Sequence, residues 1–347
     1  MRSIRITIVA LALAAAGCGG GGGGGGPGTP ASSESGEAAQ DSAIAESEGD
    51  FAGLVDVGGG RQIYLECSGT GSPTVVFESG LRGAADVWGM SGAGEGAPAV
   101  FPEVADFARV CAYDRPGTVV GGESPSRSDP APQPTTARDA VADLRALLGA
   151  AGERGPYVLV GRSYGGLVVR LYAMTYPRDV SGLVLIDALS EFLQAGMTPE
   201  QRESWKPLAD PVTQEDVAAY EGIERPDMDR SFEEVRAAAA LRPLPLVVLS
   251  ADRPWGPQVP PLIDSGELPP GTPPDFGHVI DAAQKSAQED LAKLVPNAQH
   301  VTETDSGHDI HIEQPQLVID AIRRVVDAAE DNAETVGVAE GAERTQN

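Results

Sequence analysis

The sequence predicts an α/β protein in which a mostly parallel β-sheet is covered by helices on both faces. Short runs of Val, Leu and Ile alternate along the chain with segments of helical spacing, a pattern typical of strands buried between helical layers. Strands are expected at 53–57, 61–67, 74–79, 109–114, 157–162, 182–188, 244–251 and 298–303, and helices at 135–149, 164–175, 279–294 and 315–329. Because ligands of such sheets bind beyond the carboxyl ends of the strands, polar residues at those ends are the functional candidates.

Residues 1–17 have the features of a secretory signal peptide. Arg2 and Arg5 supply positive charge, and residues 6–16 form an apolar core of eleven residues. A helix that spans a membrane needs roughly twenty apolar residues, so this segment is too short to be one. We therefore expect the protein to be exported.

Cys18 directly follows this segment. The preceding residues complete Ala-Ala-Gly-Cys at 15–18, which resembles a bacterial lipobox, in which the cysteine is lipid-modified and begins the mature protein. The resemblance implies a cell-envelope lipoprotein that is anchored to the outer face of the membrane. The alternative is ordinary cleavage near residues 14–16, which would release a secreted protein.

Composition divides the remaining chain into one folded domain between two flexible segments. Residues 18–50 hold the cysteine and a linker of Gly, Ser and acidic residues, too poor in apolar side chains to fold. Residues 51–329 have a normal length for a single α/β domain, and the acidic residues 330–347 are expected to be a disordered tail. The formal net charge of −26 repels nucleic acid, so we expect no nucleic-acid partner.

Residues 161–166, Gly-Arg-Ser-Tyr-Gly-Gly, carry the main functional prediction. An apolar β-branched run at 157–160 precedes them, and residues of helical spacing at 167–173 follow. A strand, a Gly-x-Ser-x-Gly turn and a helix make a nucleophile elbow, which presents one serine hydroxyl above the carboxyl edge of the sheet. We therefore expect Ser163 to be the nucleophile and the backbone N–H of Tyr164 to bind an oxyanion.

The elbow and its surroundings resemble the α/β-hydrolase superfamily. The resemblance covers about residues 52–328 and includes Cys-Ala-Tyr-Asp-Arg at 111–115 and Gly-Leu-Val-Leu-Ile-Asp at 182–187. The chain departs from the family at Arg162, where relatives usually have histidine, and at 78–80, where many have His-Gly. The resemblance implies the α/β-hydrolase fold with an eight-stranded sheet, and an esterase-like serine hydrolase that needs no cofactor.

His308 is the expected general base. It lies in the loop after the last strand and just before a helix, which is where the family places its base. His300 lies inside that strand, and His278 lies in a Pro/Gly-rich insertion or at the start of a helix. His311, one helical turn beyond His308, is the alternative base.

The acid that orients the imidazole is expected to be Asp252, because it ends the seventh strand, the usual family position. Asp187 ends the sixth strand, a position that some family members use, and is the alternative acid. By resemblance, the second oxyanion donor is the N–H of Leu81, in the loop after the third strand. Arg162 is expected to bind a substrate carboxylate or phosphate, or to pair with Glu78 or another nearby acid.

The resemblance also implies several supporting features. Residues 114–117 should support the oxyanion loop rather than take part in catalysis. The family's strand order sets the second and fourth strands side by side, so Cys67 and Cys111 are expected to form a disulfide in an exported protein. A helical lid at 189–242 and a second insertion at 254–276 are expected to border the substrate pocket.

These features predict an exported serine hydrolase that cleaves a carboxylic ester or a related small-molecule acyl substrate through an acyl-enzyme on Ser163. A peptidase or a lactonase with the same triad is an open alternative, and so is a non-catalytic binding lipoprotein of the same fold. The cysteine and histidine spacings match no zinc site, so we expect no metal.

Overall fold

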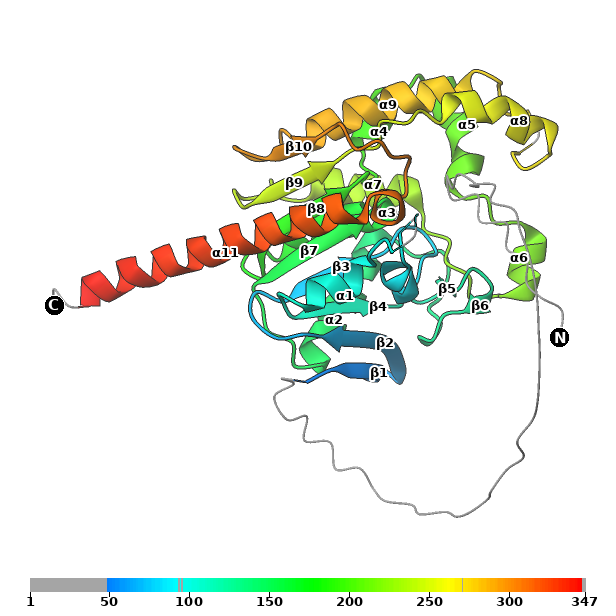
Figure 1. Cartoon of the computed structure of the whole chain (residues 1–347). Helices are drawn as coiled ribbons and strands as arrows, with labels where there is room; N and C mark the ends of the chain where they lie inside the picture. The colour runs from blue at the N-terminus through cyan, green and yellow to red at the C-terminus, as the bar shows by residue number, and fades with distance from the viewer. Residues whose placement is uncertain (1–48, 93, 95, 270, 345–347) are drawn as a thin grey trace, which may run out of the picture.

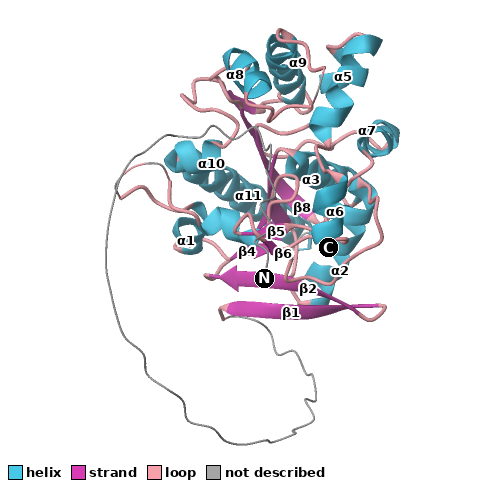
Figure 2. Cartoon of the chain, turned by 90° about the vertical axis from the view of Figure 1, so that its right-hand side faces the viewer, coloured by secondary structure: helices cyan, strands magenta, loops and turns pink. Residues whose placement is uncertain are grey.

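An eight-stranded sheet forms the centre of the molecule (Figures 1 and 2). The computed structural model describes residues 49–344, apart from 93, 95 and 270, so the predicted signal peptide and Cys18 lie outside the described residues. The sheet contains β1 (Phe51–Gly58), β2 (Arg61–Ser68), β3 (Val75–Glu78), β4 (Val110–Tyr113), β7 (Tyr157–Arg162), β8 (Val180–Ile186), β9 (Leu246–Leu249) and β10 (Gln299–Val301). Each of these strands overlaps one of the expected apolar runs.

The strand order across the sheet is β1-β2-β4-β3-β7-β8-β9-β10. The pairs β1–β2 and β2–β4 are antiparallel, and all neighbours from β4 to β10 are parallel. A separate two-stranded sheet joins β5 (Val119–Val120) to β6 (Ser124–Pro125). The mostly parallel eight-stranded sheet confirms the predicted α/β-hydrolase fold.

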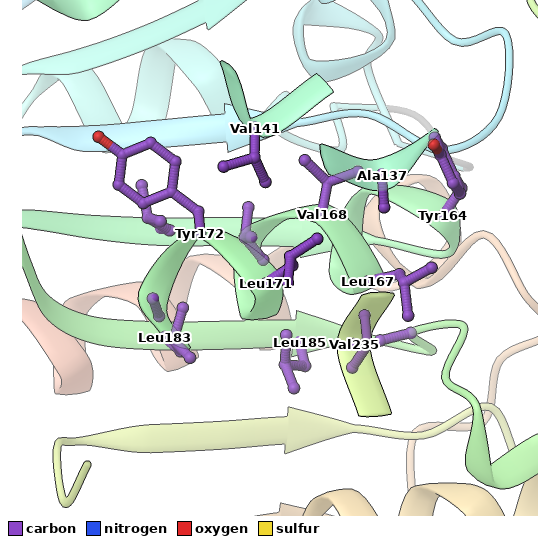
Figure 3. Close-up of a cluster of buried hydrophobic side chains, with 14 of the residues drawn as sticks. Ala137, Val141, Tyr164, Leu167, Val168, Leu171, Tyr172, Leu183, Leu185 and Val235 are labelled. Carbon is purple, nitrogen blue, oxygen red and sulfur yellow. The ribbon is translucent and has the colours of Figure 1, made fainter. Parts of the chain in front are cut away.

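Successive residues of the central strands serve two different cores. In β7, Val158 and Val160 belong to the core on one face, whereas Leu159 belongs to the core on the other. The helices α1 (Val100–Ala105) and α11 (Pro315–Arg344) cover the first face (Figure 1). The helices α2 (Ala137–Ala150) and α3 (Tyr164–Thr175) cover the second, where α3 packs between α2 and strand β8 (Figure 3). Because both faces are buried, the strands are apolar at nearly every position, which is why the runs were visible in the sequence.

The predicted disulfide between Cys67 and Cys111 is present. The two cysteines lie directly opposite each other on the antiparallel strands β2 and β4, with Cα atoms 4.1 Å apart. The bond closes a loop with a sequence separation of 44 residues. In the chain-entropy model, a loop of this length stabilises the folded state by about 4 kcal/mol.

The C-terminal segment differs from the prediction. A disordered tail was expected from residue 330, but α11 continues to Arg344 and extends away from the domain (Figure 1). Val318 and Val325 pack against the sheet, and this packing offsets the free-energy cost of forming the first turns of the helix. The residues that follow are rich in Glu and Ala, which are good helix formers, so a low apolar content does not end the helix.

Helices also fill the two insertions. The segment between β8 and β9, where the lid was expected, contains α4 (Phe192–Ala195), α5 (Pro199–Ala209), α6 (Gln214–Ala219) and α7 (Met228–Ala237). After β9 come a 3-10 turn, η2 (Gly256–Gln258), and the helices α8 (Val259–Asp264) and α9 (Phe276–Leu291). Among the described residues, no helix combines the length and apolar character needed to cross a membrane.

Candidate active site

Ser163 occupies the sharp turn between β7 and α3. Its backbone has φ 51° and ψ −122°, a conformation that is strained for a residue with a side chain. The N–H of Ser163 donates to the carbonyl of Ile186 at 3.1 Å, and its own carbonyl accepts from the N–H groups of Gly166 at 2.9 Å and Leu189 at 2.8 Å. These bonds hold the strained turn in the geometry of a nucleophile elbow.

Gly165 lets the elbow approach the loop after β3. A Cβ atom at this position would collide with the backbone carbonyl of Glu78 and lie 2.5 Å from the carbonyl oxygen of Ser79. Because backbone atoms cannot move aside as a flexible side chain can, a glycine is required here. The close approach brings the predicted oxyanion loop next to Ser163.

His308 meets a carboxylate at the end of β8. Its Nδ1 lies 2.5 Å from Oδ2 of Asp187, and both side chains are largely buried. Oδ1 of the same carboxylate accepts from the backbone N–H of Ala251 and from the side-chain amide of Gln284 in α9, each at 3.3 Å. With Nδ1 held by the carboxylate, Nε2 is the ring nitrogen left for proton transfer, as in a Ser-His-Asp triad.

Asp252, the expected acid, does not contact His308. Its carboxylate instead accepts from the N–H groups of Ser306 at 3.0 Å and Asp305 at 3.1 Å, and from the hydroxyl of Thr304 at 3.3 Å. Partial loss of contact with water alone would raise the pKa of Asp252, but these donors outweigh that effect and hold the pKa below its usual value. The Asp252 carboxylate is thus bonded to the loop that leads to His308. The expected acid was wrong, because the carboxylate beside the imidazole is that of the alternative, Asp187.

One cavity joins Ser163, His308 and Asp187. It has a volume of about 150 Å³, and its walls come from the elbow, the oxyanion loop, the lid and α9. Its lining is mostly apolar, through Leu81, Leu189, Leu193, Trp205, Leu208, Ala209, Pro211, Met228 and Ile280. Its polar lining consists of Ser163, Asp187 and His308 together with Arg82, Arg162, Tyr164 and Gln284.

Both predicted oxyanion donors border this cavity. Tyr164 is the first residue of α3, so its N–H has no acceptor within the helix. Leu81 follows Gly80, which packs so closely on the elbow that a Cβ there would lie 3.3 Å from Cβ of Ser163. The structure therefore brings Leu81 and Tyr164 together with Ser163, His308 and the alternative acid.

Arg162 forms an ion pair with Asp309, the residue that follows His308. The prediction that Arg162 pairs with a nearby acid is therefore confirmed, and the acid is Asp309 rather than Glu78. Glu78 instead forms an ion pair with Arg115 and accepts from the hydroxyl of Tyr113. Arg115 also donates to backbone carbonyls of the oxyanion loop, in agreement with the supporting role expected for residues 114–117.

The other histidines lie outside the cavity. His311, the alternative base, is buried against Trp88 with ring centroids 5.2 Å apart. Burial, together with nearby Arg162 and His308, holds the pKa of His311 well below its usual value. Nε2 of His300 lies 2.7 Å from Oγ of Ser250, and His278 is mostly exposed.

Gln284 is a site residue that the sequence did not indicate. It lies on α9, reaches the Asp187 carboxylate and lines the cavity. No local pattern distinguishes it from other polar residues of that helix, because its role depends on how the helix crosses the end of β8.

Cys67, Cys111 and Glu153 form the one cluster with metal-ligand spacing among the described residues. Both sulfurs are bonded to each other, and Glu153 forms a buried ion pair with Arg109. Thiolates rather than disulfide sulfurs bind metal, so this cluster does not fit a metal ion.

The fold and the elbow define an α/β protein of hydrolase architecture. A family model described as the alpha/beta hydrolase family matches residues 75–321, and the chain belongs to this family. Family membership supports a hydrolytic function.

Solved structures with the same fold include esterases. A thermophilic esterase from Thermogutta terrifontis is 23% identical with a TM-score of 0.51, and the match covers 80% of this chain and 99% of that one. The carboxylesterase CesB (YbfK) from Bacillus subtilis is 17% identical with a TM-score of 0.50, covering 80% of this chain and 91% of that one. At these identities the likeness shows a shared fold.

Among curated proteins, "Probable transporter efuK" of Hormonema carpetanum is 25% identical over 189 residues, which are 53% of this chain and 25% of that protein. The chain spans less than half the length of the curated relatives that it matches.

Proposed function

We propose that this chain is a serine hydrolase that cleaves small carboxylic esters through an acyl-enzyme on Ser163. The observation that carries the proposal is the convergence of the elbow serine, the His308–Asp187 pair and the oxyanion loop around one cavity. A binding module would need neither a strained elbow nor a histidine held by a buried carboxylate. A histidine held by a carboxylate is what activates a serine hydroxyl, and the elbow is what presents that hydroxyl to a substrate in this fold.

In the proposed first step, Oγ of Ser163 attacks the ester carbonyl carbon while Nε2 of His308 takes the hydroxyl proton. Asp187 holds the ring through Nδ1 and stabilises the imidazolium that forms. The negative charge on the former carbonyl oxygen is bound by the N–H groups of Leu81 and Tyr164. The C–O bond of the ester then breaks, and the alcohol leaves with the proton from His308.

The second step regenerates the enzyme. A water molecule gives a proton to His308 and attacks the acyl carbon, passing through an oxyanion at the same two N–H groups. The bond to Oγ of Ser163 breaks, the carboxylic acid leaves, and the serine recovers its proton from His308. Ser163, His308, Asp187 and the two N–H groups thus provide every group that both steps use besides the ester and water.

The cavity favours a small apolar acyl group. A volume of about 150 Å³ is close to that of a protein cavity that holds benzene. Its apolar walls include four residues of the lid, Leu189, Leu193, Trp205 and Met228. We therefore propose acetyl, butyryl or similarly small acyl groups rather than long acyl chains.

A panel of p-nitrophenyl esters from acetate to palmitate tests this proposal. We expect kcat/KM to be highest for the short esters and to fall steeply toward palmitate. The Ser163→Ala variant should lose about 10⁴-fold or more in kcat, since triad members act as a unit. Turnover that survives in a folded Ser163→Ala variant would overturn the proposed nucleophile. A folded wild type that cleaves none of the esters would favour a peptidase, a lactonase or a binding protein, which amide and lactone substrates then separate.

A further inference from the structure

The peptide units on both sides of Leu81 are held from outside the oxyanion loop. The carbonyl of Gly80 accepts from Nη2 of Arg115 at 2.7 Å, and the N–H of Arg82 donates to Oε2 of Glu224 at 2.6 Å. In a planar trans peptide, the C=O and the N–H point in opposite directions. The same carbonyl also accepts from the N–H of Gly83 within the loop, at 3.0 Å. Because the Gly80 carbonyl and the Leu81 N–H belong to one peptide unit, Arg115 and this turn bond together set the direction of the proposed oxyanion donor.

Glu224 in turn holds Arg115. Its two carboxylate oxygens accept from Nε at 2.7 Å and from Nη2 at 3.0 Å. On its other side, Nη1 of Arg115 pairs with Glu78 and donates to the carbonyl of Ser79 at 2.8 Å. Glu78, Arg115 and Glu224 are all at least 97% buried. Charges this deeply buried persist only when they are paired and hydrogen-bonded, so the three groups depend on one another.

The charge of Arg115 survives this burial. Burial alone would lower the pKa of the guanidinium, but the carboxylates of Glu224 and Glu78 hold that pKa well above its usual value. A charged donor makes stronger hydrogen bonds to carbonyl oxygens than a neutral one does. The carbonyls of Ser79 and Gly80 are thus fixed by charge-assisted bonds.

Glu224 belongs to the lid, between α6 and α7. Its N–H donates to the carbonyl of Gly117 at 2.9 Å, and its own carbonyl accepts from Nε of Arg82 at 3.1 Å. Gly117 has φ 87°, and a Cβ there would collide with the carbonyl of Gly222. The lid backbone is therefore seated directly on the loops that follow β3 and β4.

We infer that Glu224 is a positioning residue of the proposed oxyanion hole, which locks the lid, Arg115 and the peptide units around Leu81 into one arrangement. The inference rests on the proposed function. Glu224 does not line the substrate cavity, so it acts on the oxyanion through Arg115 and the loop. Its removal should therefore weaken binding of the transition state more than binding of the substrate.

The variant Glu224→Gln tests this inference, because it keeps the shape of the side chain and removes its charge. Loss of one oxyanion donor costs on the order of 10²–10³ in kcat, so misdirecting the donor should lower kcat by roughly 10–100-fold. We expect KM for a short ester to stay within about twofold, because ground-state contacts are retained. The affinity for a boronic acid that mimics the tetrahedral intermediate should fall in parallel with kcat.

Glu191→Gln is the matched control. Glu191, just before α4, forms an ion pair with Arg170, and both residues are at least 92% buried. Neither residue lines the cavity, and their hydrogen bonds join them to each other and to Arg236 rather than to the oxyanion loop. The control should lose stability and keep the wild-type kcat.

Two results would overturn the inference: a folded Glu224→Gln variant with wild-type kcat, or an equal loss of kcat in Glu191→Gln. If Glu224→Gln does not fold, Glu224→Asp keeps the charge but withdraws the carboxylate by one methylene, and wild-type kcat there counts equally against the inference. Ser163→Ala in the same assay separates the two proposals. Turnover without Ser163 rejects the proposed function, whereas an inactive Ser163→Ala beside a fully active Glu224→Gln rejects this inference alone.

Discussion

Asp187 and Asp252 follow neighbouring strands, but their carboxylates have different partners. The carboxylate of Asp187 is next to the imidazole of His308, whereas that of Asp252 accepts from the backbone of residues 305 and 306. A carboxylate that stabilises an imidazolium must lie at Nδ1, so Asp187 is placed to do so. Asp252 is placed to shape the loop that carries His308.

The two aspartates should therefore respond differently to the same substitution. We expect Asp187→Asn to fold and to lose on the order of 10⁴ in kcat, because asparagine favours the wrong imidazole tautomer. Asp252→Asn should retain most of its activity and lose a modest amount of stability, since its side chain is exposed and its loop bonds are only weakened. Ester turnover and thermal melts of both variants measure this. The reverse activity pattern would identify Asp252, after β9, as the acid.

His311 should make stability depend on pH. Its buried ring stays neutral, because burial and nearby Arg162 and His308 lower its pKa below the ordinary value of 6.5. The unfolded chain takes up a proton below pH 6.5 and the folded chain does not, so this group costs stability as the pH falls. The cost between pH 6.5 and 5.5 is about 1 kcal/mol.

Urea unfolding of wild type and His311→Phe at several pH values checks this expectation. The variant keeps an aromatic ring against Trp88 and lacks the titrating group. We expect its free energy of unfolding to fall less than that of wild type between pH 6.5 and 5.5. Parallel pH profiles for the two proteins would contradict the assignment of a neutral buried His311.

At the scale of elements, the contact between α3 and the loop after β3 is the critical one. Gly165 is where the helix meets the carbonyls of Glu78 and Ser79, so Gly165→Ala should push the oxyanion loop away from the elbow. We expect a stability loss of about 1–3 kcal/mol, as for overpacked cores, together with a marked loss of kcat. Gly149→Ala in α2 is the control, because a Cβ there meets nothing within 4 Å and should add up to about 1 kcal/mol of helix stability.

Chemical denaturation and ester turnover of these two glycine variants give both numbers. A Gly165→Ala protein as stable and active as wild type would show that the loop can yield without consequence.

The sequence predicted elements well where their signal is local. The elbow, the strands and the disulfide depend on apolar runs, on turn residues and on the strand order that the family implies. The predicted end of α11 at residue 329 was wrong. Beyond the packed part of this helix, its length depends on helix propensity rather than on apolar content. The choice between Asp187 and Asp252 was also beyond the sequence, because both aspartates end strands and only loop packing decides which carboxylate reaches His308.

Long-range contacts mark the limit of prediction at the site. Glu224 meets Arg115 across a sequence separation of 109 residues, and Gln284 meets Asp187 across 97. Neither residue belongs to a motif, since each owes its position to how an insertion docks on the sheet. The roles of such residues follow from the tertiary packing of the lid and α9, which no local sequence pattern encodes.

At the scale of the whole molecule, we propose that the hydrolase domain is exported and held at a membrane by a lipid on Cys18. The proposal rests on the charged and apolar residues before Cys18 and on the Gly-rich linker that follows it. We expect Cys18→Ser to move the protein from the membrane fraction to the soluble fraction while ester turnover is unchanged. Fractionation of cells that produce each form measures this, and a wild-type protein found wholly in the soluble fraction would contradict the lipid anchor.

Labelling with a fluorophosphonate probe tests the central claim most directly, because the probe reacts with a serine that is activated by a histidine and held near an oxyanion hole. We expect one probe per molecule, mapped by peptide mass to Ser163, with little labelling of Ser163→Ala or His308→Ala in their folded forms. No labelling of the folded wild type, or equal labelling of Ser163→Ala, would contradict the claim that Ser163, His308 and Asp187 form an acyl-transfer site.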